Sequence, residues 1–274
     1  MNRQLFNHQG HDVREDHENS FFGFRVLRDR RDLRGFSLIE LVVILAVIAI
    51  LAAVIAPSMV QQIGGTRVEA TQDEVRVLHE AMVGPPSGGT QFAFVGDIGR
   101  LPKTFQELVQ PGGLPAYTTA TVRSVGMGWR GPYVNTGTSA NDYLTDAFGR
   151  AYTGAATGQV RSAGPDGVAN NADDIVYPPA VPIVTGSLNV TVKTIVGGKT
   201  IVDPADYRVD VYYAANGAQA SAADSAGPFI FANVPLGLHA VRVVKTNNPD
   251  AGSIVAQDTV VVRPGSTTAA ELWF

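Results

Sequence analysis

The chain has no cysteine among its 274 residues. This absence excludes a disulfide framework, a thiol nucleophile and a cysteine metal site. Positive charge is also in deficit: the net charge is −4, and the part after residue 35 holds 14 basic and 19 acidic side chains, a net charge of −5. Because nucleic-acid binding depends on basic side chains that neutralise phosphates, we expect no nucleic-acid partner.

Histidine is scarce as well. Three of the five histidines lie before residue 35, which leaves His79 and His239. The sequence shows no order of Ser, His and Asp for nucleophilic catalysis and no histidine pair spaced for a metal, so we expect that the protein is not an enzyme. We predict that His79 is solvated on the polar face of a helix. We predict that His239 is a partly buried structural residue in a strand.

Charge is nearly absent between residues 36 and 56, where Glu40 is the one ionisable side chain in an apolar run. At 1.5 Å per residue, this run suits a helix about 30 Å long, the thickness of a bilayer core. Arginines crowd residues 25–34, and an arginine excess beside the first apolar segment keeps that side cytoplasmic. We therefore expect a single-pass protein of the inner (cytoplasmic) membrane, with its C-terminal part outside the cytoplasm.

A carboxylate inside a membrane helix costs about 2.5–3.5 kcal/mol, so Glu40 requires a reason. If the chain is cut after Gly35, Phe36 becomes a cationic N-terminus. The Glu40 carboxylate of one subunit would then pair with the Phe36 amine of another subunit inside the bilayer. The alternative is an ordinary signal anchor that happens to carry a glutamate, although an anchor gains nothing from a buried acid.

The boundary of the apolar run reads Gly35-Phe36-Ser37-Leu38-Ile39-Glu40-Leu41, and Pro57 is the twenty-second residue after the cut. This stretch resembles the class III signal of type IV pilins and type II secretion pseudopilins. The resemblance implies a cleaved leader of residues 1–35, a prepilin peptidase that cuts after Gly35, and N-methylation of Phe36. It also implies that copies of the chain polymerise into a filament on an inner-membrane assembly platform. We expect residues 1–24 to be disordered.

After Pro57 the apolar pattern becomes amphipathic, and we expect one long helix over residues 36–83. Four apolar side chains recur at helical spacing and define one face: Val68, Val75, Leu78 and Met82. Gly84-Pro85-Pro86 ends the helix. Gly64-Gly65 interrupts it at a cost of roughly 1 kcal/mol per glycine. This pair is either a hinge for extension in a filament, or a site where a neighbouring helix comes close, or simply tolerated.

Residues 84–182, here called the head, are rich in Gly, Pro, Thr and Asn. In chain order they contain Trp129-Arg130-Gly131-Pro132-Tyr133, Asp146-Ala147-Phe148-Gly149-Arg150-Ala151-Tyr152 and Ser162-Ala163-Gly164-Pro165-Asp166-Gly167. This order resembles the head of the major pseudopilin of type II secretion. The resemblance implies a small antiparallel sheet that packs on the long helix.

The last of these segments leads into a loop that holds Asp166, Asp173 and Asp174. Calcium takes six to eight oxygen ligands, from carboxylates and backbone carbonyls on flexible loops. In the pseudopilin family the matching loop binds calcium, so the resemblance assigns these three residues as side-chain ligands of a structural calcium ion. The alternative is a turn in which Asx side chains cap their own backbone.

Residues 183–274, here called the sandwich, show period-two patterning in several segments, which predicts an all-β domain. The segment Gly227–Val241 carries an aromatic strand, a Val-Pro-x-Gly turn and an alternating strand. It resembles carboxypeptidase-regulatory-like (prealbumin-like) domains, a likeness that implies a fold and no activity. The proline-rich residues 178–182 predict a stiff linker with few contacts across the boundary.

Two further candidates concern binding and cross-linking. Four aromatic residues offer either a sugar-stacking surface or, as we expect, head core and subunit contacts: Tyr117, Trp129, Tyr133 and Tyr143. Lys193 lies in the first predicted strand of the sandwich, where related surface domains use a Lys–Asn isopeptide bond. Because the final strand, residues 267–274, contains no asparagine, we expect no such bond.

Together these features predict an α+β fold with a long N-terminal helix, a pilin-like head and an appended β-sandwich. The expected function is structural: a subunit of a type II secretion pseudopilus or a type IV pilus-like filament. The alternative is that the sandwich is an adhesive or carbohydrate-binding module that the filament displays.

Overall fold

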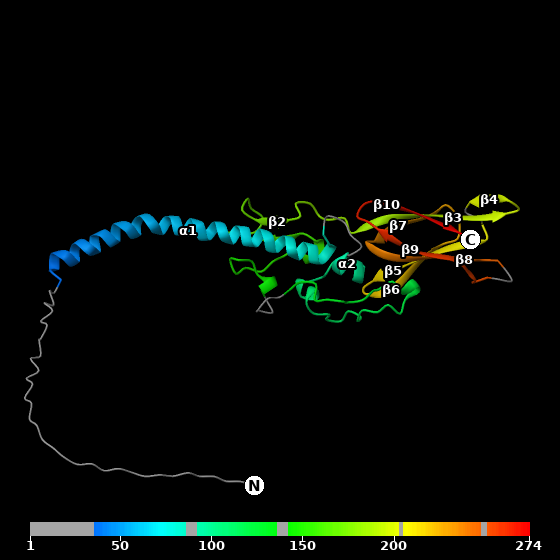
Figure 1. Cartoon of the computed structure of the whole chain (residues 1–274), viewed down its shortest axis with the longest axis horizontal. Helices are drawn as coiled ribbons and strands as arrows, with labels where there is room; N and C mark the ends of the chain where they lie inside the picture. The colour runs from blue at the N-terminus through cyan, green and yellow to red at the C-terminus, as the bar shows by residue number, and fades with distance from the viewer. Residues whose placement is uncertain (1–35, 86–91, 136–141, 203–204, 248–250) are drawn as a thin grey trace, which may run out of the picture. The chain divides into compact units, whose positions relative to one another are not determined.

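The computed structural model describes residues 36–85, 92–135, 142–202, 205–247 and 251–274 (Figure 1). The chain divides into two compact units, residues 1–54 and 55–274, which are described separately. The expected disorder of residues 1–24 and the cleavage residue Gly35 both fall outside the described residues. An N-terminal apolar helix is followed by strands that are mostly antiparallel, so the α+β prediction is confirmed.

Helix α1 runs from Leu38 to Val83. Its start is capped by Ser37, whose Oγ accepts a hydrogen bond from the Glu40 amide at 3.2 Å, while the Leu41 amide bonds the Ser37 carbonyl at 3.1 Å. An N-cap serine satisfies amides that have no partner inside the helix. The helix ends at Gly84, which adopts a φ of +98° and donates to the Glu80 carbonyl at 2.8 Å. Only glycine enters this backbone region readily, so the sequence itself sets the end of the helix.

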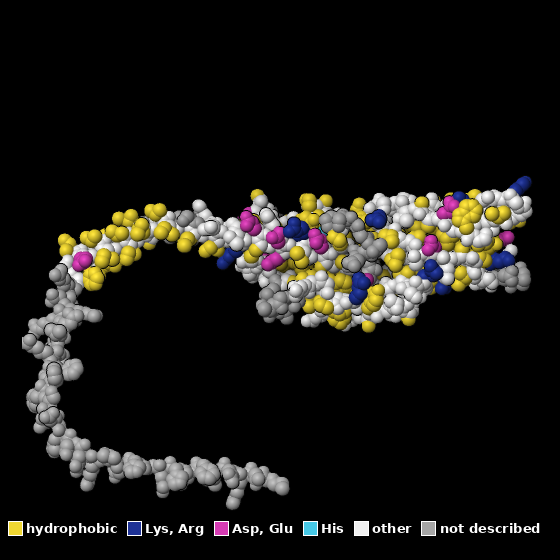
Figure 2. Space-filling view, viewed as in Figure 1, with side chains coloured by type: hydrophobic (Ala, Val, Ile, Leu, Met, Phe, Trp, Pro, Cys, Tyr) yellow, Lys and Arg dark blue, Asp and Glu magenta, His cyan; other side chains and the backbone are white. Residues whose placement is uncertain are grey.

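The first unit exposes an apolar helix. Residues 38–55 form one helix that is long and apolar enough to cross a membrane, by length and composition. Leu38 and Ile39 are 81% and 73% exposed, and the other large apolar side chains up to Ile55 are exposed as well. Figure 2 shows hydrophobic side chains over the visible face of this segment. The segment fits a single-pass membrane anchor.

The α1 residues of the second unit pack on the head. Val75, Leu78 and Met82 are at most 2% exposed, and Val68 is partly buried against the same core. The predicted apolar face is therefore confirmed. The prediction that His79 is solvated is wrong, because its side chain is 8% exposed and lies 2.9 Å from the Gly158 carbonyl. His79 follows Val75 by four residues, which places it on the same face of the helix.

The head consists of short elements joined by irregular backbone. They are α2 (Ala93–Ile98), the 3₁₀ turns η1 (Phe105–Leu108), η2 (Val122–Ser124), η3 (Asp142–Leu144) and η4 (Ala155–Thr157), and strands β1 (Val160–Ser162) and β2 (Ile175–Tyr177). Strands β1 and β2 pair antiparallel, with Val160 opposite Tyr177. Their apolar side chains join the α1 core, so the expected small antiparallel sheet on the helix is present as a two-stranded hairpin.

The sandwich contains two four-stranded sheets. Its strands are β3 (Thr185–Val196), β4 (Lys199–Val202), β5 (Tyr207–Ala215), β6 (Ala218–Asp224), β7 (Phe229–Pro235), β8 (Gly237–Lys245), β9 (Ile254–Val262) and β10 (Thr267–Trp273). One sheet has β3 paired with β10, β4 and β7, and the other has the order β6-β5-β8-β9. Only the β10–β3 pair is parallel among these described strands.

Alternation along the strands builds the core between these sheets. The inward side chains are almost fully buried: Leu188, Val190 and Val192 on β3, Val209 and Val211 on β5, Val241 and Val243 on β8, and Val260 and Val262 on β9. Residues from both sheets belong to this one cluster. The period-two pattern of the sequence therefore predicted the buried faces correctly.

The head and the sandwich share an interface, and the prediction of few contacts between them is wrong. The Gly217 amide, in the turn between β5 and β6, donates to the Ile98 carbonyl at the end of α2 at 2.9 Å. A Cβ on Gly99 would lie 1.8 Å from the Ala214 carbonyl oxygen, so the two backbones touch. Leu236 of the sandwich forms a buried cluster with Phe92 and Val95 of the head.

Candidate functional site

The N-terminal candidate residues lie at the start of α1. Phe36 is 73% exposed, and Glu40 lies in the first turn of the helix with its side chain exposed. A carboxylate in the first turn interacts favourably with the helix dipole, which is positive at this end. The structure therefore gives Glu40 a local role at the helix start. Its expected pairing with the Phe36 amine of another subunit stays a prediction.

A buried carboxylate connects the two motifs of the head. Asp146 is 4% exposed, and its Oδ1 accepts hydrogen bonds from the amides of Phe148 and Arg150, at 2.9 and 2.8 Å. Its Oδ2 accepts from the Ser162 hydroxyl at 2.5 Å, and the Ser162 oxygen in turn accepts from the Gly164 amide at 3.1 Å. Asp146 thus connects the Asp-x-x-Gly-x-x-Tyr turn to the start of the loop that holds Asp166, Asp173 and Asp174, here called the aspartate loop.

The same motif is fixed to the long helix. The Tyr152 hydroxyl donates to the Glu74 carboxylate, and the Ala147 amide donates to the Thr71 hydroxyl at 3.3 Å. Burial, followed by the Glu74 charge, raises the pKa of Tyr152, so this phenol stays protonated and remains a donor. Sequence reasoning missed Asp146 and Tyr152 as connecting residues, although their fixed spacing within the motif was the available signal.

The three predicted calcium ligands lie in one loop, where each accepts a hydrogen bond from loop backbone. Asp166 Oδ1 accepts from the Val168 amide at 2.7 Å, Asp173 Oδ2 from the Asp166 amide at 3.1 Å, and Asp174 Oδ2 from the Asn170 amide at 2.8 Å. Only the Asp166–Val168 bond is an Asx turn, the alternative that the sequence left open; Asp173 and Asp174 accept from amides that precede them in the loop.

The fit of this loop to a metal ion is mixed. Among the described residues, no group of three or more His, Cys, Asp or Glu side chains is placed to hold a metal ion. However, Asp174 Oδ1 is buried and has no hydrogen-bond partner. Carboxylate oxygens are the donors that calcium prefers, so Asp166, Asp173 and Asp174 fit calcium in kind. Their present bonds satisfy most of these oxygens with backbone and side-chain amides.

The predicted aromatic candidates mainly belong to the head core. Tyr143 is 7% exposed, and Trp129 and Tyr133 pack edge to face with ring centroids 6.1 Å apart. The Trp129 indole donates to the Glu107 carbonyl at 2.7 Å. Tyr117 is 37% exposed, with the Arg130 guanidinium 5.3 Å from the centre of its ring. The core interpretation is confirmed for all but Tyr117.

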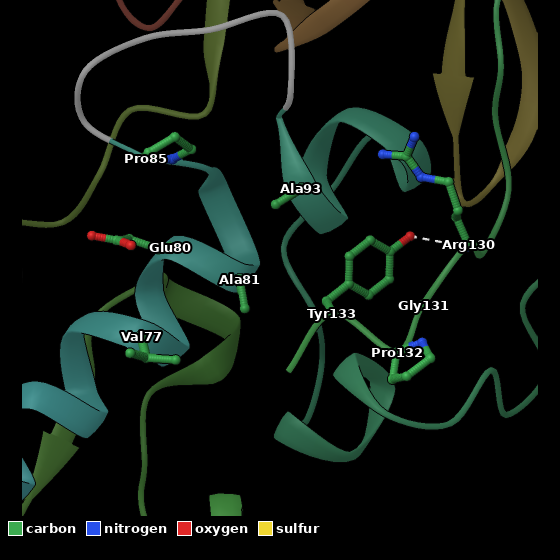
Figure 3. A pocket seen from close by; sticks show the side chains of 9 residues that line it. All are labelled: Val77, Glu80, Ala81, Pro85, Ala93, Arg130, Gly131, Pro132 and Tyr133. Carbon is green, nitrogen blue, oxygen red and sulfur yellow. Dashed lines mark hydrogen bonds between the residues drawn. The ribbon is translucent and has the colours of Figure 1, made fainter. Parts of the chain in front are cut away.

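A cleft of about 430 Å³ opens between the end of α1 and the Gly-Pro-Tyr segment of the head (Figure 3). Val77 and Ala81 line it on the α1 side and Tyr133 on the other, while the Glu80 carboxylate points away from the Tyr133 ring. The Tyr133 hydroxyl accepts a hydrogen bond from the Arg130 amide at 3.1 Å and donates to Asp97 Oδ2 at 3.0 Å. These three groups therefore satisfy one another's hydrogen bonds.

Asp97 is the buried carboxyl group that accepts the hydrogen bond from Tyr133. It is 8% exposed, and the Arg130 guanidinium lies 3.1 Å from its Oδ2. Burial raises the pKa of Asp97, and the Arg130 charge and the Tyr133 hydroxyl oppose that rise. The group therefore acts as a structural anchor for the loop that carries Arg130.

His239 lies inside the sandwich. Its side chain is 1% exposed, with Nε2 2.7 Å from the Pro235 carbonyl and Nδ1 buried without a partner. Burial lowers the pKa of His239 to about 4, so the ring is neutral at pH 7. The prediction of a structural histidine is confirmed by this burial.

Lys193, the residue considered for an isopeptide bond, forms an ion pair in the structure. Its Nζ lies 2.6 Å from Glu271 Oε2 on the neighbouring strand β10 and 5.0 Å from the centre of the Trp273 ring. The Trp273 indole also donates to Glu271, and the hydrogen bonds from Lys193 and Trp273 lower the pKa of Glu271.

Comparison with known proteins identifies the N-terminal segment. The family model of the prokaryotic N-terminal methylation motif matches residues 30–56. The chain carries a type IV pilin-like signal. This motif implies processing by a prepilin peptidase and assembly into filaments. The matched residues include Phe36, Glu40 and the whole membrane-length apolar segment, residues 38–55. No curated protein matches the chain.

Proposed function

We propose that the protein is a structural subunit of a type II secretion pseudopilus or a type IV pilus-like filament. The observation that carries this proposal is the exposed apolar start of α1, with one carboxylate, directly inside the methylation motif. Cleavage after Gly35 releases Phe36 as the new N-terminus. The processed subunit is a single-pass protein of the inner membrane, with residues 84–274 outside the cytoplasm. The assembly platform then extracts it from the membrane into the filament.

Burial of the apolar helix drives polymerisation. The large apolar side chains from Leu38 to Val54 are all at least 40% exposed within the subunit. Burying a Val, Leu or Ile side chain contributes about 1.5–3 kcal/mol relative to exposure. Packing these helices together in a filament core keeps this surface out of water once the subunit has left the bilayer. The Glu40 carboxylate then sets the register by pairing with the Phe36 amine of a neighbouring subunit.

The subunit has a structural role and no catalytic one under this proposal. The two histidines after residue 35 are both buried and bonded to backbone carbonyls, and the Asp97 carboxyl is held by Arg130 and Tyr133. Buried groups with such fixed partners stabilise a fold. They do not exchange protons readily with a substrate.

The motif order of the head favours the secretion pseudopilus, and with it a structural calcium ion. Asp166, Asp173 and Asp174 would hold the ion, and the buried unpartnered Oδ1 of Asp174 supports this assignment. Bound calcium would neutralise the carboxylates of the loop. The Asp146–Ser162 network fixes the start of this loop, so its carboxylates are brought near one another before any ion binds.

The proposal is tested by changing Glu40 to valine in the full chain, with Glu69→Val as the matched control. Glu69 is an exposed glutamate further along the same helix. Glu40→Val should be cleaved normally and yield few or no filaments, because an unpaired amine in an apolar core is costly. Glu69→Val should assemble normally. Normal filament yield from Glu40→Val, counted by electron microscopy, would contradict the pairing and the assembly mechanism built on it.

A second candidate function is an adhesive or carbohydrate-binding role for the sandwich. The observation that favours it is Trp273, which is 50% exposed next to the Lys193–Glu271 ion pair. An exposed ring beside polar groups is a surface on which a sugar can stack. Polysaccharide binding by intact filaments that is lost in Trp273→Ala would support this role, and equal binding by the variant would oppose it.

A further inference from the structure

Arg150 holds the turn that leads into the aspartate loop. The Gly167 amide closes this turn by donating to the Ala163 carbonyl at 3.1 Å. Arg150 donates through Nη1 to the Gly164 carbonyl and through Nη2 to the Pro165 carbonyl, the latter at 3.1 Å. A Cβ on Gly167 would lie 2.6 Å from Arg150 Nε. The guanidinium therefore lies directly on the backbone of the turn and bonds two consecutive carbonyls.

The opposite side of the turn faces a carboxylate. Asp173 Oδ2 accepts from the Asp166 amide at 3.1 Å, and a Cβ on Gly164 would lie 2.1 Å from the Asp173 carbonyl oxygen. The Arg150 guanidinium thus donates hydrogen bonds to two carbonyls of the turn, and the Asp173 carboxylate accepts one from an amide of the turn. This arrangement brings Asp166 and Asp173 together without a metal ion.

Arg150 is itself positioned by local contacts. Its amide donates to Asp146 Oδ1 at 2.8 Å, and its guanidinium carbon lies 5.6 Å from the centre of the Phe148 ring. Hydrogen bonds from a charged donor are stronger than neutral ones, and the planar fork of arginine can bond two acceptors at once. A lysine at this position keeps the charge and loses the fork.

We propose that Arg150 is a positioning residue that serves as the resident cation of the aspartate loop. It folds the loop in the absence of metal, so a calcium ion would join an arrangement that already exists. This inference depends on the proposed calcium site only in naming calcium as the ion that the loop would bind. The folding of the metal-free loop by Arg150 is a property of the chain alone.

The test is hydrogen exchange of the full chain in detergent micelles with a calcium chelator. The informative amides are those of Asp166, Gly167 and Asn170, which are hydrogen-bonded within the loop. In Arg150→Gln they should exchange about tenfold faster than in the original protein, since a bond to a charged group is lost. Arg150→Lys should fall between the two.

Arg161→Gln is the matched control. Arg161 lies on β1 next to the loop, and its guanidinium donates to the Gln159 side chain at 3.2 Å. Its removal should leave loop exchange unchanged. Unchanged exchange in Arg150→Gln would overturn the proposal. So would an equal acceleration of core amides on β8, because the effect would then be general destabilisation.

Adding calcium separates this inference from the calcium site. If calcium slows exchange of the loop in the original protein, the calcium proposal stands. If calcium has no effect in any variant, the calcium site fails, while the comparison in chelator still decides the role of Arg150.

Discussion

Replacing Leu236 with alanine tests whether the head and the sandwich unfold as one unit. Leu236 is 1% exposed and packs in a cluster with Phe92 and Val95, which come from the head. Partly buried Val184 and Val261 of the sandwich also border this cluster. A Leu→Ala change at a fully buried site costs about 2–5 kcal/mol, from lost burial and the cavity that remains. Because both regions contribute atoms to the cluster, both should lose stability.

The two tryptophans make this measurable. Trp129 lies in the head and Trp273 in the sandwich, so the variants Trp273→Phe and Trp129→Phe each leave a fluorescent reporter in one region. A unit of this size shifts its melting temperature by about 2–4 °C per kcal/mol, so Leu236→Ala should lower it by roughly 4–20 °C. The shift should be equal for both reporters.

The control is Leu238→Ala, two residues later in the chain and on β8. Leu238 is 40% exposed, so its truncation should lower the melting temperature by clearly less. If Leu236→Ala moves only the Trp273 transition, the two regions unfold independently, and the interface does not couple them. The same coupling implies that removing residues 183–274 would expose Phe92 and Val95 and destabilise the head. This outcome differs from the expectation of few contacts across the linker at residues 178–182.

Three further outcomes are expected. Gly35→Val should accumulate full-length precursor, and mass spectrometry of the original mature protein should find Phe36 at its N-terminus; another N-terminus would contradict the cleavage site. Because burial lowers the pKa of His239 to about 4, the folded state binds fewer protons than the unfolded state, whose histidine titrates near 6.5. Stability should therefore fall as the pH drops below about 6.5, by about 2 kcal/mol at pH 5, and His239→Gln should lose less of its melting temperature between pH 7.5 and pH 5. Chelator should lower the melting temperature if calcium binds only the folded state, and Asp174→Ala should remove that response; identical melts with calcium and chelator would favour the Asx turn.

The candidate site was only partly predictable from the sequence. The aspartates of the loop are evident from their spacing, because they are close neighbours in the chain. The residues that hold the loop are not, since Asp146 and Arg150 meet Ser162 and Gly164 only after the motif turn folds against β1. A guanidinium that bonds backbone carbonyls leaves no pattern in the residues that it bonds.

The sequence by itself determined those helices and strands that depend on interactions between residues close together in the chain. The apolar run, Ser37 and Gly84 specify the extent of α1, and alternating Val and Leu specify the buried faces of the strands. These depend on periodicity and backbone preference, which act over a few residues. Tertiary structure alone decided that His79 is buried and that Leu236 packs into the head. It decided these because burial depends on which distant segment covers a side chain, and no local pattern records that.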